Sequence, residues 1–258
     1  MRRFALWLIP LATAACIHPA TQPGPVLPDR PGFSDMPNVL PAGAVQLESG
    51  FTDDRVAGTT YQTAGEALLR VGVGSGLELR MFGNSYAMRT GGGAAATRGM
   101  EDAKIGAKLR IIDLPDSVHG LTPSLALLVS SSLPTGAPGL TAGVAQPEAH
   151  VAADWTTSGP LSFAANAGIA EAFDGAAWSN QGSAIASASF DINAHLSLFA
   201  EGMRVVALSG PSQSATYVDG GVTFLLGEQL QLDAHIGRGI SRGVSGERSF
   251  GFGIAHRF

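Results

Sequence analysis

Two polar side chains in the second half of the chain have the types that a hydrolase needs. His195 and Ser197 are two residues apart, so they share one face of an extended strand, and an imidazole beside a hydroxyl can begin a nucleophilic site. Such a site also needs a group that orients the imidazole, and the sequence offers no evident acidic or amide partner. We therefore expect no catalytic residue and no enzyme activity, and we keep a lipid hydrolase as a minor alternative.

Metal, phosphate and nucleic-acid chemistry have even less support. The other histidines are dispersed, and none pairs with another at metal-ligand spacing on one element: His18, His119, His150, His235 and His256. Cys16 is the single cysteine, which excludes an intramolecular disulfide and a thiolate cluster. The glycine-rich RTGGGAAAT lacks the Lys-Ser or Lys-Thr of a phosphate loop. With a net charge of −5 and scattered basic residues, we expect no cofactor, no metal and no nucleic-acid partner.

Alternating apolar and polar residues organise the chain from Gly43 to Phe258 and predict strands. Twelve runs lie near 44–52, 64–73, 77–86, 102–112, 122–132, 148–156, 161–170, 183–192, 195–204, 215–226, 229–238 and 248–258. Short connections such as GSG alternate with long ones such as LPTGAPGLTAGVAQ, an asymmetry typical of bacterial outer-membrane barrels. Charged residues are only 14% of the chain. The sequence thus predicts an all-β fold, a twelve-stranded antiparallel transmembrane β-barrel of the outer-membrane type, over residues 43–258.

Strand parity divides each run into an apolar and a polar face. With the apolar face toward lipid, the charged residues expected in the lumen are Glu48, Glu66, Arg70, Glu78, Arg80, Lys104, Lys108, Arg110, Glu201, Asp219, Asp233, His235 and Arg257. They could form charged rings that select solutes, or ion pairs that brace neighbouring strands. We favour ion pairs for most individual residues, although both roles can coexist.

The start of the chain predicts export. Met1, Arg2 and Arg3 precede the apolar run FALWLIPLATAA, which is typical of a secretory signal peptide over residues 1–15. The sequence LATAAC resembles a lipobox and makes Cys16 a candidate lipidation site; cleavage without lipidation is the alternative. Residues 16–42 form a proline-rich leader, with seven prolines between 17 and 42. The sequence does not decide whether this leader plugs the barrel.

Several segments resemble one family. DRPGFSDMPNVLPAGAVQLESGF, EDAKIGAKLRI, SSSLPTG and FGFGIAHRF follow in order over nearly the whole mature chain. They are similar to the outer-membrane family named for the meta-pathway of phenol degradation, whose members are often described as transporters. The resemblance implies a barrel that passes small, often hydrophobic or aromatic, compounds. It transfers no catalytic motif and establishes no substrate.

We therefore expect a passive or weakly selective channel for small solutes in the outer membrane of a Gram-negative bacterium. Its expected partners are outer-membrane lipid, an unidentified small solute, and the outer-membrane insertion machinery, which would read the terminal Phe258 as an assembly signal. A closed structural or surface-display barrel without transport is the main alternative, and an outer-membrane lipid hydrolase the minor one.

Overall fold

The computed structural model describes residues 24–93, 95–114 and 120–258. The expected signal peptide, Cys16 and the first part of the leader lie outside these residues. The strands are β1 (Val45–Val56), β2 (Thr59–Gly74), β3 (Leu77–Phe82), β4 (Tyr86–Gly91), β5 (Thr97–Met100), β6 (Lys104–Ile112), β7 (Ser124–Ser132), β8 (Gln146–Thr156), β9 (Leu161–Phe173), β10 (Trp178–Asp191), β11 (Leu196–Ser209), β12 (Ala215–Leu225), β13 (Leu230–Gly239) and β14 (Arg248–Arg257). No helix among the described residues is long and apolar enough to cross a membrane.

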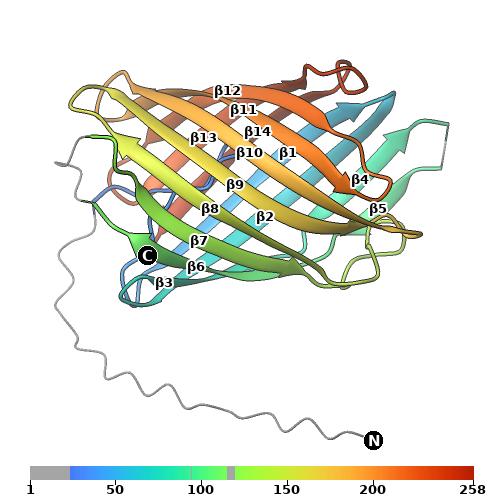
Figure 1. Ribbon diagram of the computed structural model, residues 1–258, viewed down its shortest axis with the longest axis horizontal. Helices are drawn as coiled ribbons and strands as arrows, with labels where there is room; N and C mark the ends of the chain where they lie inside the picture. The colour runs from blue at the N-terminus through green and yellow to red at the C-terminus, as the bar shows by residue number, and fades with distance from the viewer. Residues whose placement is uncertain (1–23, 94, 115–119) are drawn as a thin grey trace, which may run out of the picture.

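The strands close into a twelve-stranded antiparallel barrel (Figure 1), which confirms the expected fold. The first and last strands pair from Gln46↔Arg257 to Arg55↔Arg248, so the sheet has no free edge there. The fourteen segments make twelve wall strands because β3 with β4, and β5 with β6, are halves of two interrupted strands. β2 pairs with both β3 and β4 along its length.

The sequence does not predict the β4–β5 hairpin, which occupies a segment expected to be one long loop. Tyr86 pairs with Met100, and Arg89 pairs with Thr97. The first two strands also extend further than expected, to a two-residue turn at Ala57 and Gly58 that both have positive φ. This conformation suits a tight hairpin because its twist matches that of the flanking strands.

One end of the barrel carries the compact connections 75–76, 157–160, 192–195 and 226–229, together with the longer 113–123. The opposite end carries 133–145 and 240–247 as its longer loops, but 174–177 has only four residues because β9 and β10 extend into the expected loop. In that turn the Asp174 carboxylate accepts hydrogen bonds from the backbone N–H groups of Ala177 and Ala176, at 2.8 and 2.9 Å. These bonds lower the pKa of Asp174.

The two faces of the wall differ as a transmembrane barrel requires. In β14, Phe250, Phe252 and Ile254 are exposed on the outer surface, whereas Gly251 and Ala255 are buried on the inner side. The buried charged and polar residues come from the other parity of the strands, and they include fully buried Arg70 and Lys108. A barrel with so many buried charges needs counter-charges inside it.

Candidate functional site

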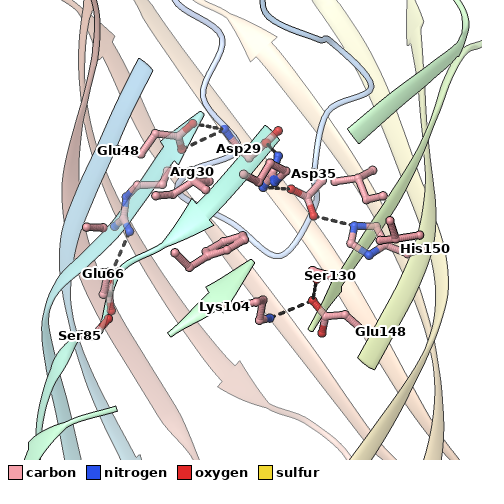
Figure 2. A pocket seen from close by; sticks show the side chains of 17 residues that line it. Asp29, Arg30, Asp35, Glu48, Glu66, Ser85, Lys104, Ser130, Glu148 and His150 are labelled. Carbon is pink, nitrogen blue, oxygen red and sulfur yellow. Dashed lines mark hydrogen bonds and ion pairs between the residues drawn. The ribbon is translucent and has the colours of Figure 1, made fainter. Parts of the chain in front are cut away.

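Three charged residues of the leader supply part of those counter-charges. The leader enters the lumen beside the β12–β13 turn, where the Val26 N–H donates to the Glu228 carbonyl at 2.7 Å. Arg257 of β14 donates to the carbonyl of Pro25 at 3.3 Å and to that of Gly24 at 2.5 Å. The segment then folds into a loop inside the barrel (Figure 2) and leaves at Gly43, whose N–H donates to the Gly72 carbonyl at 2.8 Å.

Asp29 of the leader is the centre of a buried ion cluster. Its carboxylate lies 2.8 Å from the Lys108 Nζ and 3.4 Å from the Arg70 Nη1, and it also contacts Arg80. Its backbone N–H donates to the Glu48 carboxylate at 3.1 Å. Three wall cations from β2, β3 and β6 therefore converge on one leader carboxylate.

Wall carboxylates complete this cluster. Glu78 accepts from the Arg70 Nε at 2.8 Å, and Glu48 accepts from the Arg70 Nη1 at 3.0 Å. Glu78 also accepts from the Leu40 N–H of the leader, at 3.1 Å. The cluster is thus both a brace between wall strands and an anchor for the leader.

The tip of the leader loop reaches the opposite wall. Asp35 accepts from the Arg80 Nη2 at 3.0 Å and lies 2.8 Å from the His150 Nε2 of β8 (Figure 2). The Asp35 N–H donates to the Asn166 Oδ1 of β9 at 2.7 Å, and the Asn166 Nδ2 donates back to the Asp35 carbonyl at 2.9 Å. The loop therefore crosses the lumen from β3 to β9.

Glu201 of β11 holds the same loop from a further side. Its carboxylate accepts from the Ser34 N–H at 3.1 Å and the Ser34 Oγ at 2.9 Å, and it also accepts from the Phe33 N–H. A wall carboxylate that binds two backbone N–H groups and a hydroxyl group fixes the position of the leader.

Arg30 carries the leader's positive charge toward acidic wall residues. Its guanidinium lies 2.9 Å from the Glu66 Oε2 and 3.5 Å from the Asp233 Oδ2. Gly253 makes room for it, because a Cβ there would come within 2.3 Å of the Arg30 Nε. Glu66 has a φ of 36° within an irregularity of β2, and such a bulge re-aims a side chain at the expense of local strain.

A cavity of about 340 Å³ lies beside the leader and is shown in Figure 2. Its walls combine charge with apolar surface, since Leu68, Phe82 and Leu128 line it together with Lys104 and Glu148. The Lys104 Nζ lies 2.8 Å from the Glu148 Oε1 and 5.3 Å from the centre of the Phe82 ring. This cavity can therefore contact both an apolar group and a polar group of one small molecule.

A second cavity of about 160 Å³ lies against other residues of the leader. It is lined by Pro31 and Ser34 of the leader and by hydroxyl and amide side chains of the wall, including Ser187, Thr223 and Gln231. The leader contributes to both cavities and lies inside the same lumen. Any solute that moved along the barrel would meet the leader.

The structure places the charged residues named from the sequence as follows. The ion cluster around Asp29 contains Glu48, Arg70, Glu78, Arg80 and Lys108. Other leader residues are contacted by Glu66, Asp233, Glu201 and Arg257. Outside these contacts, Lys104 lines the larger cavity, Asp219 and His235 are buried on β12 and β13, and Arg110 pairs with Asp113 at 2.7 Å. Phe258 donates its N–H to the Val45 carbonyl at 2.9 Å.

The two residues of the hydrolase candidate have different surroundings. His195 ends the β10–β11 turn and is exposed, while the Ser197 Oγ donates to the Asp191 carboxylate at 2.6 Å. Within the described part of the chain, no group of three His, Cys, Asp or Glu residues could hold a metal ion.

Sequence reasoning missed the leader's own charged residues and two wall residues that accompany them. Asp29, Arg30 and Asp35 lie in a proline-rich segment without periodicity, so parity could not place them. Glu148 and His150 are two residues apart on β8 and share a face with the other polar groups. The alternation of residues in this strand could therefore have placed both side chains in the lumen.

Known structures with similar folds include outer-membrane channels and porins. The COG4313 outer membrane channel from Pseudomonas putida F1 aligns with a TM-score of 0.70 at 13% identity, over 89% of this chain and 99% of that one. The NanC porin aligns at 0.56 with 10% identity, over 81% and 98% of the two chains. The KdgM porin, solved in complex with disordered oligogalacturonate, aligns at 0.53 with 10% identity, over 82% and 99%. These likenesses support the fold.

Sequence comparison assigns the family. Among curated proteins, no sequence matches this chain. A family model described as "Putative MetA-pathway of phenol degradation" matches residues 28–258, which includes the described leader from Pro28 onward and the whole barrel. This match confirms the resemblance found in the sequence, and the chain belongs to that family.

Proposed function

We propose that this protein is a weakly selective outer-membrane channel for small solutes, with a lumen that the leader narrows. The observation that carries the proposal is the position of residues 24–42, which lie within the lumen and line two separate cavities. Polar and ionic contacts hold most of this segment, and water or a polar solute can replace such contacts. A channel narrowed in this way passes small molecules slowly.

The larger cavity supports a solute that has both an apolar and a polar part. Phe82, Leu68 and Leu128 offer apolar contact, and Lys104 and Glu148 offer charges of both signs. A volume of about 340 Å³ is at the lower end of ligand pockets. The family description refers to phenol degradation, which agrees with a small aromatic compound as a candidate solute.

The location that we propose is the outer membrane of a Gram-negative bacterium. The apolar outer surface and the likeness to outer-membrane channels support it. The same proposal includes outer-membrane lipid around the barrel and recognition of Phe258 by the insertion machinery. The short connections and both ends of the described chain would then face the periplasm.

The alternative is a closed structural barrel, and the buried cluster at Asp29 favours it. Arg70 and Lys108 are fully buried and each makes several contacts with the leader or with neighbouring wall residues. A leader that never left this position would block passage. In the channel the leader lets a small solute pass or is displaced by it, whereas in the closed barrel the leader blocks the lumen permanently.

Single-channel recording in planar bilayers, with uptake of neutral and aromatic solutes into vesicles, separates them. The full-length protein should show a small conductance, and deletion of residues 24–42 should raise it because the segment occupies the lumen. Heat-modifiable migration of both proteins would show that each barrel is folded. If both folded forms are electrically silent and impermeable, the transport function is wrong and the closed barrel is correct.

A further inference from the structure

Three arginines form a row across neighbouring strands on the outer surface of the barrel. In the strand register Arg55 of β1 lies opposite Arg248 of β14, and Arg248 lies opposite Arg238 of β13. All three are exposed and have the parity of the outward apolar residues, such as Ile236 and Phe250. Like charges directly opposite each other on paired strands destabilise a sheet unless an anion lies near them.

The protein supplies only part of the counter-charge. Asp53 lies on the same face, but its carboxylate accepts from the Arg55 Nε at 3.2 Å and from the Gln62 Nε2 at 2.7 Å. Glu247, next to Arg248 in the chain, hydrogen-bonds with Tyr217. Among the described residues, the side chains of Arg238 and Arg248 form no hydrogen bond and no ion pair with another side chain or the backbone. Their guanidinium groups are therefore free to bind an anion from outside the chain.

An apolar groove begins at the same place. It has a volume of about 720 Å³ and lies over β11 to β14, with Arg238 among its lining residues. Small Gly220 and Ala234 form part of its lining, and Val218 and Ile236 project beside them. Arg238 lies four positions along the strand from Ala234, or about 13 Å in an antiparallel strand. A linear hydrocarbon chain therefore fits beneath the cation.

Two other apolar grooves on the outer surface have no exposed arginine among the described residues that line them. One, of about 580 Å³, contains Ala149, Ala167 and Ala184, and another, of about 610 Å³, contains Leu79 and Ile105. Of these three grooves, the one over β11 to β14 has an exposed arginine in its lining, Arg238, and this arginine lies opposite Arg248 in the strand register.

We propose that this surface binds a phosphorylated lipid of the outer leaflet. The phosphate would accept charge-assisted hydrogen bonds from the Arg238 and Arg248 guanidinium groups, which suit phosphate oxygens in geometry and charge. An acyl chain would fill the groove past Ile236 and Ala234. The level of the site follows from the proposed outer-membrane orientation, because the arginines lie near the loop 240–247, at the end opposite Phe258.

Native mass spectrometry of the full-length protein in a neutral detergent tests the site, with lipid A as the diphosphorylated probe. The double variant Arg238→Gln/Arg248→Gln should lose at least about tenfold in affinity for lipid A, because it loses hydrogen bonds to a charged group. Arg98→Gln is the matched control. Arg98 is exposed on β5 and faces Met88 rather than another arginine, so its replacement should leave binding unchanged.

A second pair of variants tests the groove. Ala234→Phe should weaken binding by filling the groove while the outer surface stays apolar. Ala167→Phe, in the groove without an arginine, should not. Heat-modifiable migration identifies the folded variants. Unchanged binding by the double arginine variant, equal loss in Arg98→Gln, or equal binding of dephosphorylated lipid A would each overturn the proposal. None of these measurements depends on solute transport.

Discussion

Replacing Asp29 by Asn tests whether the central ion cluster keeps the leader in the lumen. The Asp29 side chain is only 3% exposed, and its carboxylate lies 2.8 Å from the Lys108 Nζ and 3.4 Å from the Arg70 Nη1. Removing one partner of a buried ion pair costs about 3–5 kcal/mol. Because Asn keeps the shape and part of the hydrogen bonding, we expect about 3 kcal/mol. That free energy shifts the docking equilibrium of the leader roughly a hundredfold.

The assay is single-channel recording of the full chain. Asp29→Asn should raise the conductance or the open time toward that of the protein without residues 24–42. Asp113→Asn is the control, since its carboxylate pairs with Arg110 at 2.7 Å but is 57% exposed. An exposed pair contributes about 0–1 kcal/mol, and this variant should behave as the wild type does.

The double variant Asp29→Asn/Lys108→Met separates loss of docking from general damage. Removing both charges leaves less uncompensated charge inside the barrel. The decrease in the free energy of unfolding, measured in urea, should therefore be smaller for the double variant than the sum of the decreases for the two single variants. Wild-type conductance in Asp29→Asn, together with additive losses in the double variant, would refute the ion cluster as the anchor of the leader.

Three other predictions concern the wall. Leu109→Arg places a charge on the exposed outer surface and should lower the yield of folding into vesicles more than Arg110→Ala does, because an arginine facing lipid costs up to about 2–4 kcal/mol, less toward the membrane interfaces; equal yields would contradict the assigned faces. Deletion of Phe258 removes the N–H bond to Val45 and its ring contact with His256 at 4.5 Å, and should lower the heat-modifiable fraction; an unchanged fraction would exclude its role in assembly. Asp102→Ala removes an acceptor for the N–H groups of Gly136 and Ala142, at 2.8 and 3.1 Å, and should speed protease cleavage within 133–145; cleavage at the wild-type rate would show that Asp102 does not hold this loop.

The wall of the barrel could be predicted because period-two patterning survives in each strand. In β14 the alternation of Phe250, Phe252 and Ile254 with small residues is visible in the sequence and gives the outer face directly. The β4–β5 hairpin could not be predicted in this way. Its residues include RTGGG, and glycines give no packing surface from which a face can be recognised.

The contacts of the site depend on the path of the leader, which no periodicity specifies. Parity groups Arg70 and Lys108 with the polar face, but it does not reveal that Asp29 lies between them. Lys108 illustrates the difference between knowing the face of a residue and knowing its contacts. Its ammonium is fully buried against Asp29, so Lys108→Ala would leave that carboxylate with fewer partners.

Charge along the leader complements the charge of the wall in two regions. Near Asp29 the wall contributes the cations Arg70, Arg80 and Lys108 against the carboxylates Glu48 and Glu78, and the leader adds its carboxylate there. Near Glu66 and Asp233 the wall is acidic, and the leader adds the cation Arg30. If the leader left, both regions would expose unbalanced charge of opposite sign to the lumen. Water or a polar solute would have to solvate these charges as the leader moved. Displacement of the leader is therefore coupled to the entry of a polar group into the barrel.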